Sequence, residues 1–310
     1  MPWVVGIDEA GYGPNLGPLL QAAVAVKLPA SDVAGWDTLK PHVRRHADRD
    51  KKRTLVDDSK LVHSGKNGLE KLEQGLVALL GLRATTLGDW LNQIALEHVV
   101  NDLHAEAWYD GTLSLPLFPN PPADLRPTLL AMNIETQIVG VNLVTTPVFN
   151  RIVHGSDSKA TVLSIGLSNL LATLQQVLSG DDKIHVYCDK QGGRNFYGPL
   201  LQGAFADGWV VTEHESATES RYRIENLGRD VSIIFRPRAD SGSISVALAS
   251  MLCKYLREVC MLQFNKYWQR HLPSLKPTAG YPVDAKRFMA EIRPILGKIG
   301  LVEDLVWRVR

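Results

Sequence analysis

The chain begins MPWVVGIDEAGYGPNLGPLL, where an apolar stretch ends in two adjacent carboxylates, Asp8 and Glu9, and runs on into glycines and prolines. The apolar residues predict a buried strand over residues 3–7. Burying two carboxylates beside such a strand without partners would cost several kcal/mol, roughly enough to prevent it. The sequence therefore requires something that compensates these two charges.

The size and composition suit a large core. A chain of 310 residues with 45% hydrophobic content can form one large domain or two smaller ones. It has no stretch of eighteen apolar residues and no basic segment ahead of a cleavable apolar one, so we expect a cytoplasmic protein without a membrane partner. The three cysteines, Cys188, Cys253 and Cys260, form no CxxC pair, which argues against disulfides and structural zinc.

The net charge of +1 gives no general attraction to nucleic acid, so any phosphate-binding surface has to be a local patch. Lys51, Lys52 and Arg53 form one basic run. Such a run is more typical of a solvated loop than of a binding site, and both interpretations stay open.

The hydrophobic pattern predicts alternating elements. Strands are expected at residues 3–7, 21–28, 137–145, 184–188, 208–213 and 231–236, and helices at 67–80, 159–178 and 243–264. Residues 81–135 are less regular, and the proline-rich tract LSLPLFPNPPADLRP excludes a regular helix or central strand there. We interpret this region as an insertion or small subdomain, and the whole as an α/β fold with a mixed sheet.

Four acidic residues are predicted to lie at the ends of elements. Asp8 and Glu9 close the first strand, Asp189 closes a central one, and Asp240 starts a helix that follows a strand. Functional groups of α/β folds gather at the carboxyl ends of strands. Four ionised carboxylates there repel each other and need divalent cations, and oxygen ligands favour Mg²⁺ or Mn²⁺ over zinc. Taken singly, Asp189 is more typical of a turn former or cap, and Asp240 could equally cap the helix that follows.

These segments carry a resemblance to a known family. GIDEAGYGPNLGPL resembles the DEAGRGPxxGP signature of ribonuclease HII, the type 2 ribonuclease H family, and VDDSKL resembles its DSKKL segment. HVYCDKQGG is similar to the strand that ends in a catalytic Asp, RADSGSISVALASMLCKYLRE to the ADSxxxxVAAASIxAKxxRD block, and AGYPVDAKRF to the GYP segment. The motifs occur in the family's order and span residues 6 to about 288.

The resemblance implies a ribonuclease H-like fold with a mixed central sheet flanked by helices. The catalytic domain would span residues 1–265, with the insertion at about 81–135, and a C-terminal helical extension would span 266–310. The implied activity is endonucleolytic cleavage of the RNA strand of RNA/DNA hybrids, or at ribonucleotides embedded in duplex DNA, which leaves 3′-hydroxyl and 5′-phosphate ends. Alternatives are a nuclease for another duplex and a non-catalytic nucleic-acid-binding module. We expect a monomer.

The resemblance also implies the ligands of the ions. Asp8, Glu9, Asp189 and Asp240 would hold two Mg²⁺ or Mn²⁺ ions, which lie about 3.5–4 Å apart in such sites. Neighbouring strand residues point to opposite faces, so Asp8 and Glu9 serve one site only if the backbone leaves the strand there.

The loop after the strand is the first part of the implied substrate site. Gly11 and Gly13 permit a departure from strand geometry and leave backbone N–H groups accessible, although a simple hairpin turn would use them as well. In the family this loop, here Gly11, Tyr12 and Gly13, reads the junction between ribonucleotide and deoxyribonucleotide, with the 2′-hydroxyl as the distinguishing group.

Further substrate contacts are implied downstream. Lys60 matches a lysine near the scissile phosphate, and Tyr281 matches a tyrosine that stacks on the sugar next to the junction; alone, they would be an exposed lysine and a turn-packing tyrosine. Ser250, Lys254 and Arg257 are spaced i, i+4 and i+7, so they share one helix face. That face either contacts a phosphate backbone or is solvated.

The chain departs from the family pattern at three informative positions. Tyr12 stands where the family has Arg or Lys, so a cation that could contact phosphate is missing. Lys190 follows Asp189 where relatives carry a small residue, and it could reach across to neutralise a carboxylate. Glu258 replaces the usual Asp. Substrate choice is the property that these changes affect most.

Overall fold

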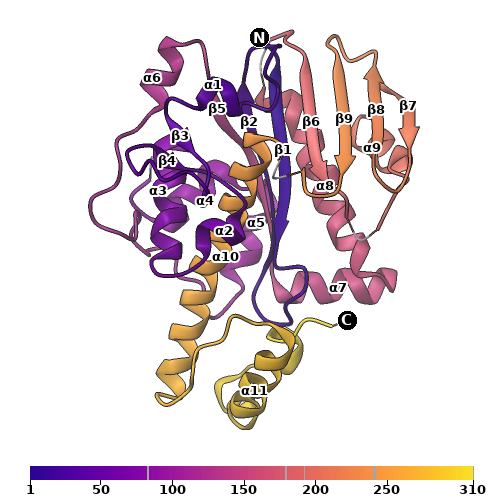
Figure 1. Ribbon diagram of the computed structural model, residues 1–310. Helices are drawn as coiled ribbons and strands as arrows, with labels where there is room; N and C mark the ends of the chain where they lie inside the picture. The colour runs from indigo at the N-terminus through magenta and orange to yellow at the C-terminus, as the bar shows by residue number, and fades with distance from the viewer. Residues whose placement is uncertain (82–83, 179, 192, 240–241, 310) are drawn as a thin grey trace.

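The computed structural model describes residues 1–81, 84–178, 180–191, 193–239 and 242–309. Within these ranges a seven-stranded sheet has the order β5-β2-β1-β6-β9-β8-β7 and carries helices on both faces (Figure 1). Its strands are β1 (Trp3–Ala10), β2 (Leu19–Lys27), β5 (Thr136–Val144), β6 (Ile184–Asp189), β7 (Trp209–Glu215), β8 (Ser220–Glu225) and β9 (Val231–Arg236).

The sheet is mixed. Strand β1 is antiparallel to β2, and β2 is antiparallel to β5. The three central strands β1, β6 and β9 are parallel, and β8 and β7 continue the sheet in antiparallel fashion. The expected mixed α/β architecture is therefore confirmed. Because β1, β6 and β9 run in one direction, their carboxyl ends open at the same edge of the sheet.

Two apolar cores lie on the two faces of the sheet. Val4 of β1 belongs to the core shared with α3 and α10, whereas Val5 and Ile7 belong to the core shared with α8 and α9. The helices are α1 (Trp36–Leu39), α2 (Ser59–His63), α3 (Gly68–Leu80), α4 (Leu87–Ile94), α5 (Glu97–His104), α6 (Arg126–Ala131), α7 (Thr146–Ser156), α8 (Lys159–Val177), α9 (Gly198–Ala204), α10 (Ile244–His271) and α11 (Pro282–Ile292). A short pair, β3 (Val43–Arg44) and β4 (Thr54–Leu55), forms a second sheet.

Helix α10 packs directly against the backbone of β1. A Cβ atom at Gly6 would lie 2.1 Å from the amide nitrogen of Val246, so only glycine permits this approach. About two turns further along α10, the Cys253 Sγ lies 3.3 Å from the backbone oxygen of Asp8. The first turns of α10 are thereby fixed against the strand that ends in Asp8 and Glu9.

Helix α8 is the one described helix that is long and apolar enough, by length and composition alone, to cross a membrane. Core helices of globular proteins pass the same test. Leu167, Leu170 and Leu174 on α8 are fully buried in the core that α8 shares with the sheet. Their burial accounts for the apolar composition of this helix.

The region over residues 81–135 folds as part of the main core. Leu87 and Trp90 of α4, and Val99 of α5, join the apolar cluster that contains α3 and α10. The buried Glu73 carboxylate accepts hydrogen bonds from the amides of Leu117 (2.7 Å) and Phe118 (2.9 Å). The proline-rich tract is thus tied to α3.

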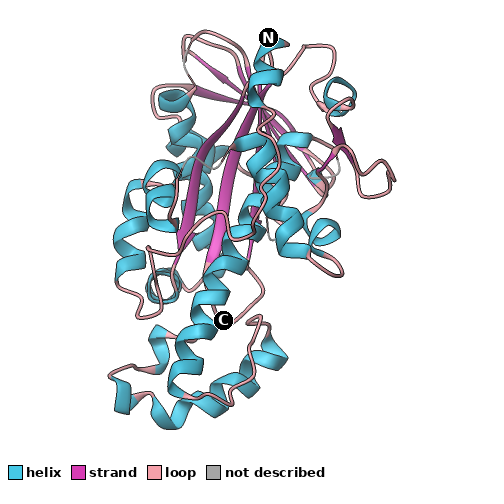
Figure 2. Ribbon diagram, turned by 90° about the vertical axis from the view of Figure 1, so that its left-hand side faces the viewer, coloured by secondary structure: helices cyan, strands magenta, loops and turns pink. Residues whose placement is uncertain are grey.

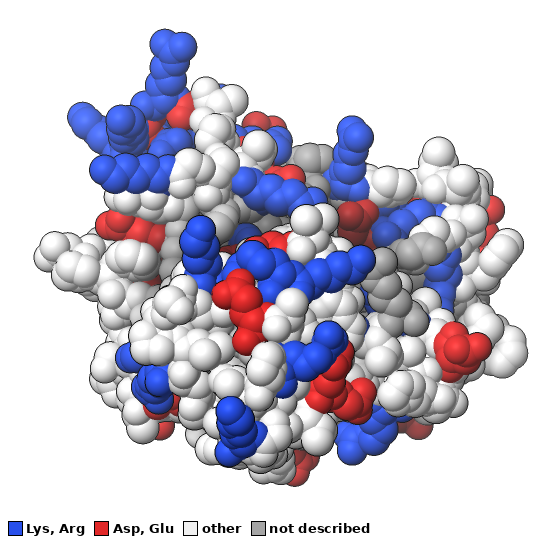
Figure 3. Space-filling model, turned by 90° about the horizontal axis from the view of Figure 1, so that it is seen from below, with Lys and Arg blue, Asp and Glu red and all other residues white. Residues whose placement is uncertain are grey.

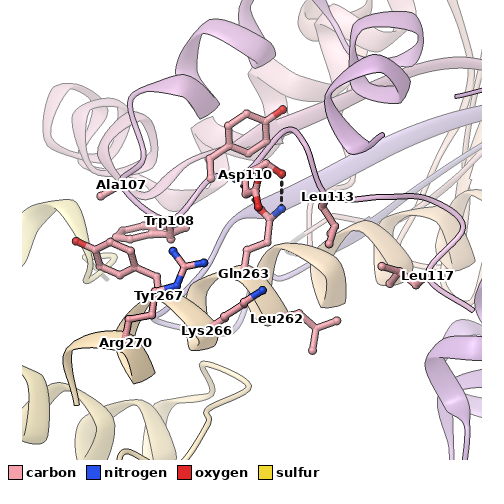
Figure 4. Close-up of a pocket in the computed structure, with 11 residues that line it drawn as sticks. Ala107, Trp108, Asp110, Leu113, Leu117, Leu262, Gln263, Lys266, Tyr267 and Arg270 are labelled. Atoms are coloured by element: carbon pink, nitrogen blue, oxygen red, sulfur yellow. Dashed lines mark hydrogen bonds between the residues drawn. The ribbon is translucent and has the colours of Figure 1, made fainter. Parts of the chain in front are cut away.

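The loop after α5 rests on the second half of α10 (Figure 4). The Gln263 side chain donates to the backbone oxygen of Asp110 at 2.7 Å, and the Trp108 ring meets the Phe264 ring edge to face at 5.0 Å. A pocket of about 270 Å³ lies between the two segments, with Lys266 and Arg270 on its α10 side.

Buried Glu106 in the same loop gives a testable pH dependence. Burial raises its pKa from 4.5 to about 7, although the Trp108 indole N–H donates to its carboxylate at 2.8 Å. The folded state holds this proton more tightly than the unfolded state, so the free energy of unfolding falls as the pH rises from about 4.5 to about 7. We expect Glu106→Gln to remove that fall and to stabilise the protein at pH 8 by up to about 3 kcal/mol.

Denaturant unfolding of both proteins between pH 4.5 and pH 8 measures this difference. Exposed Glu97 on α5 supplies the control, because Glu97→Gln should leave the pH profile unchanged. Parallel profiles for wild type and Glu106→Gln would show that Glu106 ionises normally in the folded protein.

The C-terminal region is helical, as expected. Helix α10 continues unbroken across residue 265 to His271, so the proposed start of the extension lies inside a helix. Helix α11 and three short 3₁₀ turns, Arg293–Ile295, Gly297–Ile299 and Glu303–Leu305, complete this region beyond the edge of the sheet toward which β1 points (Figures 1 and 2). The division into domains remains a prediction.

Residues near the C-terminal end of the described chain return to the loop after β1. The buried Arg308 guanidinium donates to the backbone oxygen of Gly11 at 2.7 Å and also to that of Pro14. The Arg308 amide donates to the Asn15 oxygen at 2.9 Å. The segment around Arg308 therefore supports the loop between β1 and β2 (residues 11–18), which we call the glycine-rich loop.

Candidate active site

Strands β1 and β6 separate at their carboxyl ends, and we call this point of separation the notch. Strand β1 pairs with β6 only as far as Ile7 opposite Cys188, but it stays paired with β2 through Asp8, Glu9 and Ala10. The expected departure from strand geometry at Asp8 and Glu9 does not occur on the β2 side, where the hydrogen-bonded register continues. Strand β1 instead separates from β6 only, and Asp8 and Glu9 lie beyond the last pair between these two strands, Ile7 with Cys188.

Strand alternation assigns the two carboxylates to different faces. Val4 faces the α10 side and Val5 and Ile7 face the α8 side, so Asp8 belongs to the α10 face and Glu9 to the α8 face. A Cβ at Gly6, two residues before Asp8 on the strand, would meet Val246 of α10, which agrees with this assignment. A single ligand can therefore contact both Asp8 and Glu9 only where β1 has separated from β6.

The charges of the acidic residues nevertheless interact. Burial raises the pKa of the Glu9 carboxyl well above its usual range, and the carboxylates of Asp8 and Asp189 raise it further. A hydrogen bond from the Gln191 side chain and the positive charge of Lys60 act in the opposite direction. Three of the predicted acidic residues therefore lie within electrostatic reach of each other, and their repulsion favours a bound cation.

Asp189 is held by backbone amides. Its Oδ1 accepts from the amides of Lys190 (3.0 Å) and Arg238 (2.8 Å). Burial raises the pKa of the Asp189 carboxyl, while these amides, that of Ala239 and the charge of Lys60 lower it. The amides orient the carboxylate at the end of β6.

Lys60 lies at the start of α2, where the Asp58 side chain caps the helix by accepting from the Lys60 amide at 2.8 Å. Its side chain is exposed, and its charge acts on both Glu9 and Asp189. The structure thus brings together Asp8, Glu9, Asp189 and Lys60 from three separate segments.

The predicted metal site is only partly described. Asp240, the fourth predicted ligand, lies outside the described residues. In the part of the chain that the structure describes, no three His, Cys, Asp or Glu side chains are arranged to hold a metal ion. The chemistry of the donors fits Mg²⁺ or Mn²⁺, because clustered carboxylate oxygens with raised pKa values are compensated best by a hard divalent cation.

Lys190 does not neutralise the acidic residues. Its ammonium group donates to the Asn195 side chain (2.8 Å), the Ser216 backbone oxygen (2.5 Å) and the Ser220 hydroxyl (3.0 Å). These partners lie around the turn between β7 and β8. The departure at this position changes the support of that turn and leaves the charge of the acidic cluster intact.

The loop after β1 holds a cation that the sequence analysis missed. The Lys159 ammonium, at the first position of α8, lies 5.0 Å from the centre of the Tyr12 ring and 3.5 Å from the Tyr12 backbone oxygen. A positive charge therefore accompanies Tyr12, although it comes from 147 residues further along the chain. Gly11 has a positive φ of 94°, whereas Gly13 is exposed and has open space around it.

The predicted exposed helix face is largely buried. Ser250 donates to the Ser59 hydroxyl at 2.9 Å, and only 2% of the Arg257 side chain is exposed. Lys254 pairs with Glu258 at 2.5 Å, and about a fifth of each side chain is exposed. The expectation that the three predicted residues share an exposed face is therefore corrected: α2 and the loops around the helix cover Ser250 and Arg257.

Arg257 instead joins two segments that flank the notch. Its guanidinium donates to the backbone oxygens of Leu16 (3.3 Å) and Ala279 (2.9 Å), and it lies 5.8 Å from the Tyr281 ring. A Cβ at Gly11 would come within 2.8 Å of the Arg257 Nε. Tyr281 is 53% exposed, so its ring is accessible beside the glycine-rich loop.

Comparisons with known proteins match solved structures only. No protein-family model and no curated protein sequence matches the chain. The chain is similar to ribonuclease H2 from Pyrococcus horikoshii OT3, with 13% identity and a TM-score of 0.47 over 98% of this chain and 92% of that one. It is also similar to ribonuclease HII in a complex with PCNA from Archaeoglobus fulgidus, with 15% identity and a TM-score of 0.41 over 99% and 94%.

A third match is Bst-RNase HIII, whose crystal structure contains Mn²⁺, with 15% identity and a TM-score of 0.49 over 99% of this chain and 66% of that one. These proteins are type 2 ribonucleases H, the family that the sequence motifs resemble. The mixed sheet with its flanking helices is established by the strand order and register of this chain itself.

Proposed function

We propose that this protein is a metal-dependent endonuclease of the ribonuclease H type. It cleaves the RNA strand of RNA/DNA hybrids, or a strand at a ribonucleotide embedded in duplex DNA. The observation that supports this proposal is the gathering of Asp8, Glu9 and Asp189, together with Lys60, at the carboxyl ends of β1 and β6. A cluster of this kind costs stability unless a cation or a substrate group compensates it.

The roles of the residues follow from their positions. Asp8, Glu9, Asp189 and Asp240 would hold two Mg²⁺ or Mn²⁺ ions, which supply activation of water and stabilisation of the charge on the leaving oxygen. Lys60 contributes its ammonium group to the scissile phosphate. Cleavage then leaves 3′-hydroxyl and 5′-phosphate ends.

Two further features would recognise the ribose. The loop after β1 presents Gly13 with open space around it, so a nucleic-acid backbone can approach closely. The exposed Tyr281 ring offers a surface for a sugar next to the junction. Arg257 holds the two segments in register because it contacts both.

Four labelled substrates test the proposal: a DNA duplex with one embedded ribonucleotide, a long RNA/DNA hybrid, double-stranded RNA and plain DNA. We expect cutting of the first or the second with Mg²⁺ or Mn²⁺ and none with a chelator. The cut sites also show which duplex the protein prefers. If all four remain intact with both metals, the proposed activity is wrong.

One observation favours a second candidate. Glu9 belongs to the face of β1 opposite Asp8, and no three-ligand arrangement is present in the described part of the chain. A non-catalytic module that binds nucleic acid would fit this geometry. Such a module would bind the same four duplexes and cut none of them.

A further inference from the structure

A strongly basic pocket lies beside β4 and α3, outside the candidate active site. It has a volume of about 200 Å³, and Arg44, Lys51, Lys52, Arg53 and Lys71 line it. No carboxylate is among the described residues that line it. We call this feature the basic pocket. It contains the whole basic run that the sequence analysis left open between a solvated loop and a binding site.

The carboxylates near the basic pocket, Asp48 and Asp50, already have hydrogen-bond and ion-pair partners. Arg53 pairs with Asp48 and with Asp50, the latter at 3.0 Å, and it also donates to the backbone oxygen of Lys40 at 2.8 Å. The same two carboxylates accept from the backbone amides of Asp50 and Lys52. Arg53 and its acidic partners therefore fold the loop between β3 and β4 into a fixed shape.

The lysines of the basic pocket differ from Arg53 and Arg44, whose charges both act on the Asp48 carboxylate. Among the described residues, no carboxylate lies within ion-pair distance of Lys51, Lys52 or Lys71. The Arg44 side chain contacts the backbone oxygen of Asp48 at 3.1 Å, and its buried Nε has no hydrogen-bond partner in the described structure. Like charges held together in this way favour an anion as ligand.

The pocket is preformed. Gly75 lets α3 approach β4, since a Cβ there would lie 3.0 Å from the Leu55 backbone oxygen and 2.5 Å from the Met251 methyl carbon. Lys71 on α3 thereby comes close to the loop that carries Lys51 and Lys52. The cations converge from two segments that packing holds in place, which distinguishes them from a flexible basic tail.

The pocket also lies near the candidate active site. Leu55 lines it, and Lys60, whose charge acts on Glu9 and Asp189, follows five residues later. Five residues span at most about 18 Å. Stacked base pairs lie about 3.4 Å apart, so a duplex crosses at most about five base pairs between Leu55 and Lys60. Figure 3 shows Lys and Arg crowded at one side of the face toward which β1 points.

We infer that the basic pocket binds backbone phosphates of a nucleic-acid duplex within about half a helical turn of the phosphate that Lys60 contacts. This inference rests on the proposed function for its substrate, but the binding it describes needs neither a ribonucleotide nor cleavage. Phosphate contacts of this kind carry no sequence information and set the position of the duplex. They contribute affinity that depends steeply on salt.

Binding of plain duplex DNA, measured without divalent metal at several salt concentrations, tests the inference. We expect Lys51→Gln combined with Lys52→Gln to lower the magnitude of the slope of log K against log salt by about two, and Lys71→Gln alone to lower it by about one. Affinity at moderate salt should fall on the order of tenfold for the double variant. If variants in the loop (Lys51, Lys52) and on α3 (Lys71) both lower the salt slope, the binding site is the pocket and not the loop alone.

Lys183 and Lys298 provide the control for net charge, because both are exposed and neither lines the basic pocket, although Lys183 pairs with Asp230 at 2.8 Å. The double variant Lys183→Gln with Lys298→Gln removes the same charge and should leave the slope unchanged. The inference fails if the pocket variants and the control behave alike, because the effect would then be one of net charge only.

Inorganic phosphate separates the two sources of the ligand. Calorimetric titration with inorganic phosphate that shows saturable, lysine-dependent binding, together with an unchanged salt slope for duplex DNA, would assign the pocket to a free phosphate compound and overturn the inference. Duplex binding that depends on Lys51, Lys52 and Lys71 in a protein that cuts no substrate would support the inference while the proposed function fails. The two proposals are therefore tested separately.

Discussion

Replacement of Asp8 by Asn should reduce cutting by at least about 10³-fold, equivalent to about 4 kcal/mol of transition-state stabilisation. The substitution keeps the shape of the side chain and removes one charge from a group that would hold the ions. It also removes a source of repulsion for the buried Glu9 carboxyl, so thermal stability without metal should not fall. Cleavage rates and melting temperatures measure the two effects.

Asp181 supplies the control for this prediction. It is exposed just before β6, at the opposite end of that strand from Asp189, and Asp181→Asn should cut at the wild-type rate. If Asp8→Asn retained more than about a tenth of the wild-type rate, Asp8 would not be part of the catalytic machinery.

Glu73→Leu should lower the free energy of unfolding by about 4 kcal/mol, because it leaves several buried donors without an acceptor. The Glu73 carboxylate accepts from the amides of Leu117 and Phe118 and from the Tyr255 hydroxyl, the last at 2.5 Å. Each lost partner costs about 1–3 kcal/mol, which exceeds what the apolar leucine gains by burial. Urea unfolding measures the loss.

Glu70 lies one turn earlier on α3 and is partly exposed, so Glu70→Leu should change stability by less than about 0.5 kcal/mol. Glu73→Gln keeps one acceptor oxygen and should fall between wild type and Glu73→Leu. Equal stability of Glu73→Leu and wild type would mean that the tract around Leu117 is not fastened to α3 in solution.

The central strands could be predicted because each is a short apolar run: β1 is buried on both faces over residues 3–7, whereas buried and partly buried residues alternate along β6 and β9. Residues 3–7, 184–188 and 231–236 are short apolar runs, and they match β1, β6 and β9. Strand β8 was missed, because only Ser220, Tyr222 and Ile224 are buried and charged residues alternate with them. Its period of two was visible in the sequence. Helix α7 was missed as well, although Pro147 gives a signal for its start.

The acidic residues were found from one rule, that polar side chains at strand ends gather at one edge of a parallel sheet. The rule predicts that Asp8, Glu9 and Asp189 lie at the same edge of the sheet, and the charges of these three residues do interact in the structure. It could not place Lys159 beside Tyr12, because that contact depends on how α8 packs. The spacing of Arg257 indicated a helix face but not its burial, which depends on the distant segments that contain Leu16 and Ala279.

Support of the glycine-rich loop by Arg308 has a consequence for biosynthesis. The Gly11 oxygen and the Arg308 guanidinium are 297 residues apart in sequence, so the ribosome must add all the residues between them before this contact can form. During translation β1 can pair with β2 early, while the loop beside Asp8 and Glu9 still lacks its donor. A nascent chain that stops before residue 308 would therefore carry its acidic residues next to an unsupported loop, and the site would be completed only after residue 308 has been added.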